Sequence, residues 1–239
     1  MRSIVETFIR QVKWRTPAEK TKWDHFFRGK ALVVAPTIRP SVHKKFLDDW
    51  LLQSISMCPK GGAVYVAPLG RTGVALRVQH LRYIESGEEN IIHLLVDQQN
   101  KPYVYFDMVL FSADLHGFGA VAFYRAAQAA QRAGFDRIEL LAAGGAGYKI
   151  RSQWSRSFNG FYSWARYGFD APLHPETRIR LANIPQLAQA SCLLDVLDID
   201  PEWWRQNGAG SNLTFDLKSG SRSWYTLKNY LVSKGLKRS

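Results

Sequence analysis

The segment 114–120 holds the residues whose spacing first suggests binding chemistry. Gly117 and Gly119 stand between a strand-like run and an alanine-rich, helix-like run. Because glycine has no Cβ atom, a ligand can approach the backbone closely at these two positions. The free N–H groups and the dipole of a helix that begins there attract an anion. The turn therefore predicts a phosphate-binding site.

The same two glycines have a second interpretation. A tight turn between a strand and a helix, with the helix packed closely on the sheet, also favours residues without a Cβ atom. No Gly-Lys-Ser/Thr follows Gly119, so the segment is not a P-loop. The strands expected before it form a meander and not a βαβ unit, which argues against the dinucleotide-binding fingerprint. Taken alone, the two glycines leave both interpretations open.

Two carboxylates on expected strands are candidate general bases. In the segment 103–111, strand alternation places Tyr103, Tyr105 and Asp107 on one face, where they would form a polar lining for an acceptor. Glu139 lies on a second expected strand. We therefore take Asp107 and Glu139 as candidate catalytic residues, and Tyr103 and Tyr105 as candidate substrate-binding residues. The alternative is that these side chains face solvent from the outer side of the sheet.

A glycine-rich segment, 144–158, becomes basic and aromatic toward its end. Lys149, Arg151 and Trp154 combine cations with an indole ring, and they are candidate substrate-binding residues. Such a set holds a phosphate or an acidic substrate, or stacks on single-stranded RNA. The alternative is an ordinary exposed loop.

The composition predicts a globular chain with an anionic partner. The 239 residues are 46% hydrophobic and carry a formal net charge of +12 at pH 7. This charge favours nucleic acid, an acidic protein surface or a phosphate-rich cofactor, although a generally basic surface gives the same value. The chain has no run of about 18 apolar residues, so no membrane span is expected. The first residues lack the apolar region of a secretory signal, which predicts a cytoplasmic location.

The cysteines and two of the histidines predict structural roles. Cys58 and Cys192 are far apart in the sequence, and no second thiol flanks either of them. We therefore expect reduced, buried thiols, with no disulfide and no zinc or other metal site. His80 and His93 alternate with apolar neighbours, so each is expected to be a structural histidine.

The periodicity of apolar residues predicts the elements that must position these groups. A meander of four antiparallel strands is followed by a helix and a strand, so the last two strands of that series lie parallel. In the helix expected over 41–56, Ser41 is the N-cap, and the apolar face carries Val42, Phe46, Trp50 and Leu51. The expected strands are 30–36, 61–70, 73–85, 90–97, 103–111, 137–143 and 212–217; the expected helices are one within 1–30 that contains Ile4, Phe8 and Val12, then 41–56, 119–133, 160–169, 184–199 and 221–236.

This order of elements, with two motifs, resembles the GNAT superfamily of coenzyme A-dependent N-acyltransferases. The superfamily's pyrophosphate loop has the form Q/R-x-x-G-x-G/A; "DLHGFG" supplies Gly117 and Gly119 and places Asp114 at the Gln/Arg position. A later helix has the form A-x-x-x-Y-x-x-x-G-F; "FYSWARYGF" supplies Gly168 and ends in Phe, with Trp164 at the tyrosine position. The resemblance covers about residues 60–172.

The resemblance implies an α/β fold in which helices flank a mixed, mostly antiparallel sheet. It implies one GNAT-like domain over 1–239, with helical additions at both ends. Within it, 1–60 is an N-terminal helical and strand region, 61–172 the acyltransferase core and 173–239 a C-terminal extension. These terminal additions are similar to those of GNAT-like domains in bacterial effectors and toxins.

The resemblance also implies direct transfer of an acyl group from acyl-coenzyme A, most simply acetyl-coenzyme A, to an amine on a protein, a tRNA or a small molecule. A backbone N–H of the strand 103–111 would polarise the thioester carbonyl. Tyr162 would supply the hydroxyl that Trp164 lacks, and Asp114 would cap the helix. The implied cofactor-binding residues are Leu110, Phe111, Gly117, Phe118, Gly119 and Ala120. The alternative is a non-catalytic protein that binds nucleic acid or another partner on a GNAT-like scaffold, which the charge and the two departures from the motifs favour.

Overall fold

The structure is a computed structural model that describes residues 23–34, 40–42, 45–70, 73–84, 87–112, 116–145 and 158–237. The helix expected around Ile4, Phe8 and Val12 lies outside the described residues. The expected class is confirmed: the chain folds as an α/β protein with a mixed, mostly antiparallel sheet.

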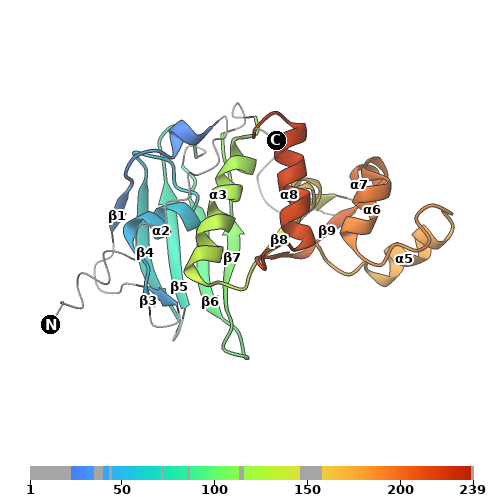
Figure 1. Ribbon diagram of the computed structural model, residues 1–239, viewed down its shortest axis with the longest axis horizontal. Helices are drawn as coiled ribbons and strands as arrows, with labels where there is room; N and C mark the ends of the chain where they lie inside the picture. The colour runs from blue at the N-terminus through green and yellow to red at the C-terminus, as the bar shows by residue number, and fades with distance from the viewer. Residues whose placement is uncertain are drawn as a thin grey trace.

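A seven-stranded sheet has the order β1-β4-β5-β6-β7-β8-β9 (Figure 1). Neighbours from β4 to β7 are antiparallel, as the predicted meander requires. β7 and β8 are parallel, β9 runs antiparallel to β8, and β1 lies parallel to β4 at the opposite edge. The strands are β1 (Leu32–Val34), β4 (Ala63–Leu69), β5 (Gly73–Gln79), β6 (Asn90–Val96), β7 (Pro102–Met108), β8 (Arg137–Gly145) and β9 (Ala209–Asp216).

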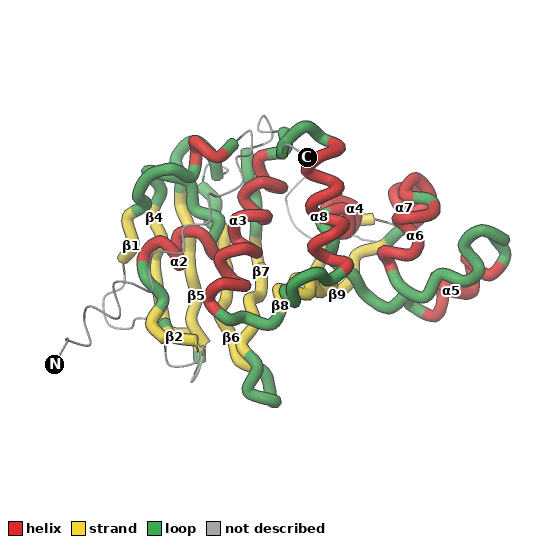
Figure 2. Tube along the Cα trace, viewed as in Figure 1, coloured by secondary structure: helices red, strands yellow, loops and turns green. Residues whose placement is uncertain are grey.

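Helices pack on one face of this sheet, where α2, α3 and α8 stand in front of the strands (Figures 1 and 2). The longest, α3, connects the parallel neighbours β7 and β8, as a crossover helix does. It ends at Gly134, whose φ of 91° is the left-handed value that favours glycine at a helix C-terminus. The helices are the short 3-10 turn η1 (Asp24–Phe26), α2 (Asp49–Ile55), α3 (Phe118–Ala133), α4 (Gly160–Arg166), α5 (Pro175–Ala182), α6 (Leu193–Ile199), α7 (Pro201–Asn207) and α8 (Arg222–Ser233).

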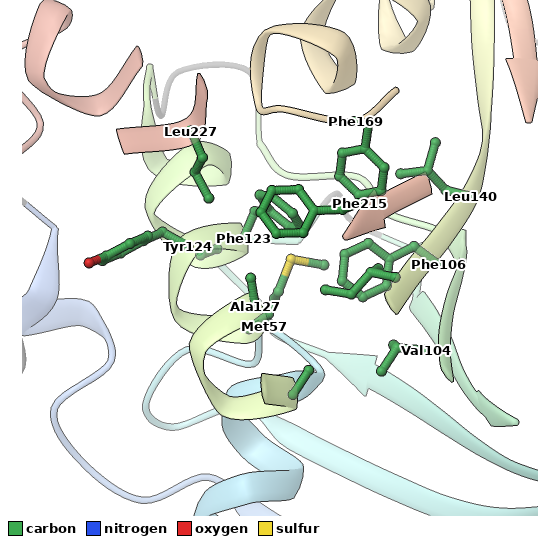
Figure 3. Close-up of a cluster of buried hydrophobic side chains, with 14 of the residues drawn as sticks. Met57, Val104, Phe106, Phe123, Tyr124, Ala127, Leu140, Phe169, Phe215 and Leu227 are labelled. Atoms are coloured by element: carbon green, nitrogen blue, oxygen red, sulfur yellow. The ribbon is translucent and has the colours of Figure 1, made fainter. Parts of the chain in front are cut away.

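Phe123 of α3 lies at the centre of the core (Figure 3). Its ring centroid lies 6.0 Å from that of Phe106 on β7, 5.0 Å from that of Phe169 and 5.1 Å from that of Phe215 on β9. Trp164 of α4 packs against the same ring at 5.7 Å, so α4 lies on the same face as α3. Aromatic packing therefore joins the crossover helix, two strands and the segment after β8 into one unit.

The opposite side of the sheet, called the open face below, keeps its side chains at the surface. Strand alternation separates the buried residues of each strand from half-buried or exposed ones. Tyr65 is 39% exposed and Leu141 is 54% exposed, whereas Val64 and Ile138 on the other side are completely buried. The open face carries Tyr65, Arg77, Ile91, His93, Tyr103, Tyr105, Asp107, Arg137, Glu139, Leu141 and Thr214.

The helix predicted over 41–56 is wrong in its first half. A small hairpin of β2 (Ser41–Val42) and β3 (Lys45–Phe46) stands there, and α2 begins only at Asp49. Asp48 is the N-cap, since its Oδ1 accepts from the N–H of Leu51 at 2.7 Å. The predicted apolar face is also wrong, because Phe46 is 72% and Trp50 47% exposed. The helix begins at the Asp48 cap, although the apolar spacing predicted an earlier start.

The C-terminal extension contains more and shorter helices than predicted. Helix within 184–199 is restricted to α6, which begins at the capping box of Cys192 and Asp195. Two short helices, α5 and α7, were not predicted; each opens with a proline, Pro175 and Pro201, at its first position. Proline at that position is a known start signal, and the sequence interpretation overlooked it. Across the described ranges, no helix combines the length and apolar composition that a membrane span needs.

Replacing Phe123 by Ala tests the central packing. We expect Phe123→Ala to lower the free energy of unfolding by about 3–5 kcal/mol, because a buried ring is replaced by a cavity. Tyr225→Ala is the matched control: this ring also lies on a helix but is 69% exposed, and we expect a change within about 0.5 kcal/mol. Urea unfolding followed by circular dichroism measures both, and equal losses would contradict the central role of Phe123.

Candidate functional site

The glycine turn before α3 is occupied by close packing. Gly117 has a φ of 80°, and a Cβ atom built on it would lie 2.7 Å from Cδ2 of Leu236, in the turn that follows α8. A Cβ atom on Gly119 would lie 3.4 Å from the ring of Phe111. The positive φ supports the tight-turn interpretation of Gly117, although its close neighbour is Leu236 and not a residue of the sheet. The phosphate interpretation stays a prediction, and Asp114 lies outside the described residues.

The parallel strands β7 and β8 pair for only part of their length. Their register runs from Tyr103 opposite Arg137 to Phe106 opposite Leu140. Beyond Leu140, β8 continues to Gly145 in register with β9 alone. The strands thus stop pairing toward their carboxyl ends, and the chain passes from this end of β7 into the N-terminus of α3. In open α/β sheets, ligands bind outside the carboxyl ends of parallel strands, where connections diverge.

A β-bulge lies at this end of β7. Ile91 of β6 stands opposite Met108, but the next residue, Ile92, stands opposite Phe106, so Asp107 is the extra residue. A bulge bends the strand and redirects a side chain, and bulges are common beside active sites. Asp107 is exposed, and the described residues give it no ion-pair partner. The bulge breaks the predicted alternation, since Met108 stands opposite Ile91 of the open face and Asp107 has no cross-strand partner on β6.

Asn90 is a polar residue that sequence analysis missed. It is completely buried, and its Oδ1 accepts from the N–H of Leu110 at 2.6 Å. The N–H of Leu110 is therefore not free to polarise a thioester carbonyl. Among the described residues, the Nδ2 of Asn90 has no hydrogen-bond partner. A buried unpaired donor costs free energy and calls for a specific acceptor such as a water or a ligand atom. The available signal was a lone amide at the start of an otherwise apolar strand.

On the open face, the structure brings together four of the predicted site residues. Tyr105 of β7 stands opposite Glu139 of β8. Two residues earlier on the same face of β7, Tyr103 stands opposite Arg137. Burial, and then the negative charges of Asp107 and Glu139, raise the pKa of Tyr105. The Tyr105 hydroxyl therefore stays protonated at neutral pH beside two carboxylates.

Arg137 forms ion pairs with two carboxylates of this cluster, Glu139 and Asp97. Its Nε lies 2.6 Å from Oε1 of Glu139, and its Nη1 lies 2.9 Å from Oδ2 of Asp97. Its guanidinium also covers the ring of Tyr103 at 4.5 Å. A backbone hydrogen bond from Lys101, together with Arg137, lowers the pKa of Asp97. Glu139 is thus held in an ion pair, whereas the described residues give Asp107 none.

Tyr162, the third candidate catalytic residue, lies apart from this cluster. It belongs to α4 on the helix-covered side of the sheet, and the guanidinium of Arg166 lies 5.1 Å from the centre of its ring. Trp164 packs into the core against Phe106 at 6.0 Å. The structure therefore does not bring Tyr162 to Asp107 and Glu139. Lys149, Arg151 and Trp154 lie outside the described residues.

Of the two cysteines expected to be buried, Cys58 is buried and Cys192 is half-buried. Burial raises the pKa of the Cys58 thiol to about 12 and that of the Cys192 thiol to about 11, which makes both poor nucleophiles at neutral pH. His80 is a structural histidine, as predicted: its Nδ1 accepts from the N–H groups of Arg82 and Tyr83 at 3.1 and 3.2 Å. In the described part of the chain, no group of three or more His, Cys, Asp or Glu residues could hold a metal ion.

Comparison with known proteins gives no match, either to a protein-family model or to a curated protein sequence. The arguments for function therefore come from the fold and from the geometry above.

The effect of the Asp107 charge on the pKa of Tyr105 can be measured directly. Because Asp107 contributes to the raised pKa of Tyr105, we expect Asp107→Asn to lower that pKa toward its ordinary value. The measurement is the pH titration of the Tyr105 Cζ resonance in protein with ¹³C-labelled tyrosine. Glu176→Gln removes an exposed carboxylate from α5 and should leave the titration unchanged; the same shift in both variants would show that Asp107 does not act locally.

Proposed function

We propose that this protein is an N-acyltransferase that moves an acyl group, most simply acetyl, from acyl-coenzyme A to an amine. The observation that carries the proposal is the partial pairing of β7 and β8: these parallel strands separate where the chain enters α3. The end of a parallel pair, beside a helix N-terminus, suits a ligand with an anionic portion and an extended portion.

The order of elements supports the same function. Four antiparallel strands lead into α3, then β8, then α4, which is the series that resembles the GNAT superfamily. Gly117 and Gly119 stand at the start of α3, and Gly168 follows α4 with a φ of 91°. The finer assignment to a GNAT-like fold belongs to this proposal, because a mixed sheet alone is compatible with other families.

The first turn of α3 would hold the anionic portion of the cofactor. The N–H groups of Phe118, Gly119 and Ala120 lie in the first turn of the helix, where intrahelical acceptors are missing. Gly117 has no side chain that could cap them. Leu236 lies against Gly117, so the C-terminal turn forms one wall of this region.

Asp107 is the residue we assign to proton removal from the acceptor. An amine must lose its proton to attack a carbonyl carbon, and Asp107 is exposed at the bulge with no described ion pair. Tyr105 stays protonated and donates a hydrogen bond to the acceptor or to a water between them. Acyl-coenzyme A supplies the activated carbonyl and the thiolate leaving group, and Tyr103 and Glu139 shape the acceptor side.

Titration calorimetry with acetyl-coenzyme A tests the proposal. We expect binding in the micromolar range and, with an amine acceptor, release of a free thiol that a disulfide reagent detects. Acetyl-coenzyme A that fails to bind at millimolar concentration would sink the proposal. Binding without thiol release in the presence of lysine peptides, small amines and aminoacyl-tRNA would refute the catalytic part.

His116 offers a charge test at the start of α3. It is exposed and immediately precedes Gly117. We expect His116→Glu to weaken acetyl-coenzyme A binding about five-fold at low salt, because a new negative charge near the phosphates adds on the order of 1 kcal/mol of repulsion. His116→Gln is the neutral control and should bind as the unsubstituted protein does. Equal affinity of both variants at low salt would place the phosphates elsewhere.

A further inference from the structure

The open face is a broad surface that the described helices do not bury. Its centre is a row that runs across five strands, through Ala75, His93, Tyr105, Glu139 and Thr214. The rings of His93 and Tyr105 stack at 6.2 Å with an interplanar angle of 17°. The exposed Tyr65 of β4 and Leu141 of β8 lie on the same face, outside this row. An aromatic and apolar surface of this kind marks an interaction site more often than a bare solvent face.

The charge of this face is opposite to that of the chain. Five carboxylates lie on the face or at its border, against two guanidiniums, Arg77 and Arg137. These carboxylates are Glu89, Asp97, Asp107, Glu139 and Asp216. Arg77 pairs with Glu89, and Arg137 pairs with Asp97 and Glu139, so these five carboxylates and two guanidiniums keep a net negative charge, whereas the chain as a whole carries +12. A local field of this sign attracts cations and repels phosphates.

We propose that the open face binds a lysine-rich peptide segment of a partner protein. The argument is charge complementarity together with shape: strands lie about 4.8 Å apart, so the five strands from β5 to β9 span about 19 Å. An extended peptide covers that span with about six residues. Asp107 accepts from one lysine ammonium group, Glu139 shares its carboxylate between Arg137 and a second one, and Tyr105, opposite Glu139, offers a ring beside them.

Two other occupants fit the charges less well. Nucleic acid brings phosphates to an acidic surface, which costs electrostatic energy. A second copy placed face to face sets like charges opposite one another. Binding of a lysine-rich peptide does not require acyl transfer, because it depends neither on the α3 turn nor on coenzyme A. If both proposals hold, the bound peptide segment carries the acceptor lysine.

The test uses an acetylated octalysine peptide and the full chain without coenzyme A. Titration calorimetry at low salt should show binding, and the affinity should fall steeply as salt rises. In the double variant Asp107→Asn with Glu139→Gln, we expect at least ten-fold weaker binding. The control Glu176→Gln with Glu202→Gln removes the same charge from α5 and α7, away from the face, and should bind within two-fold of the unsubstituted protein.

A second measurement locates the peptide. Octalysine should shift the NMR signals of the His93 and Tyr105 rings and leave those of Tyr225 unchanged. Equal loss in the two double variants, or ring shifts confined to other residues, would overturn the proposal. An oligouridylate that by itself shifts the His93 and Tyr105 signals, or spermine that binds as tightly as octalysine, would overturn the choice of a peptide. Acetyl-coenzyme A is titrated separately, so a failure to bind it would remove the proposed function and leave the peptide result intact.

Discussion

The packing of α3 onto the sheet through Phe123 is the constraint on which the rest of the structure depends. The ring of Phe123 touches rings from β7, from β9 and from the segment after α4. Each of these elements contributes to the region around the ends of β7 and β8. Because interiors are packed to crystal-like density, a shift of α3 would move all of them together. This aromatic contact set therefore fixes α3 against β7 and β9.

The two sides of the sheet divide the candidate chemistry between them. The helix-covered side holds the α3 N-terminus, the buried Asn90 amide and the tyrosine and tryptophan of α4. The open face holds the cluster of Tyr103, Tyr105, Asp107 and Glu139. Between them lie the carboxyl ends of β7 and β8, where these two strands stop pairing. A transferase that works there would take its two substrates from opposite sides.

Much of the central fold could be predicted, because its signals are local. Alternation gave β4 to β8, and Gly134 correctly marked the end of α3. The prediction of a helix over 41–56 was wrong because it followed the apolar spacing and not the cap at Asp48. The helices α5 and α7 were not predicted because short helices carry few periodic positions. Within the site, alternation placed Tyr103 and Tyr105 correctly, up to the bulge at Asp107. It could not place the bulge, the ion pairs of Arg137 or the distance of Tyr162, since these depend on register between strands and on packing of α4.

The contact between Leu236 and Gly117 joins the end of the chain to the start of its crossover helix. Leu236 is 5% exposed and follows α8 after a single turn. Any molecule that needs Leu236 to move before it can occupy the turn would lose part of its binding energy to that displacement. By thermodynamic linkage the effect is reciprocal: whatever steadies or loosens the C-terminal turn changes the affinity of the α3 turn by the same factor. The turn that contains Leu236 would thus raise the ligand concentration at which the α3 turn is occupied. The two turns are more than a hundred residues apart in the sequence.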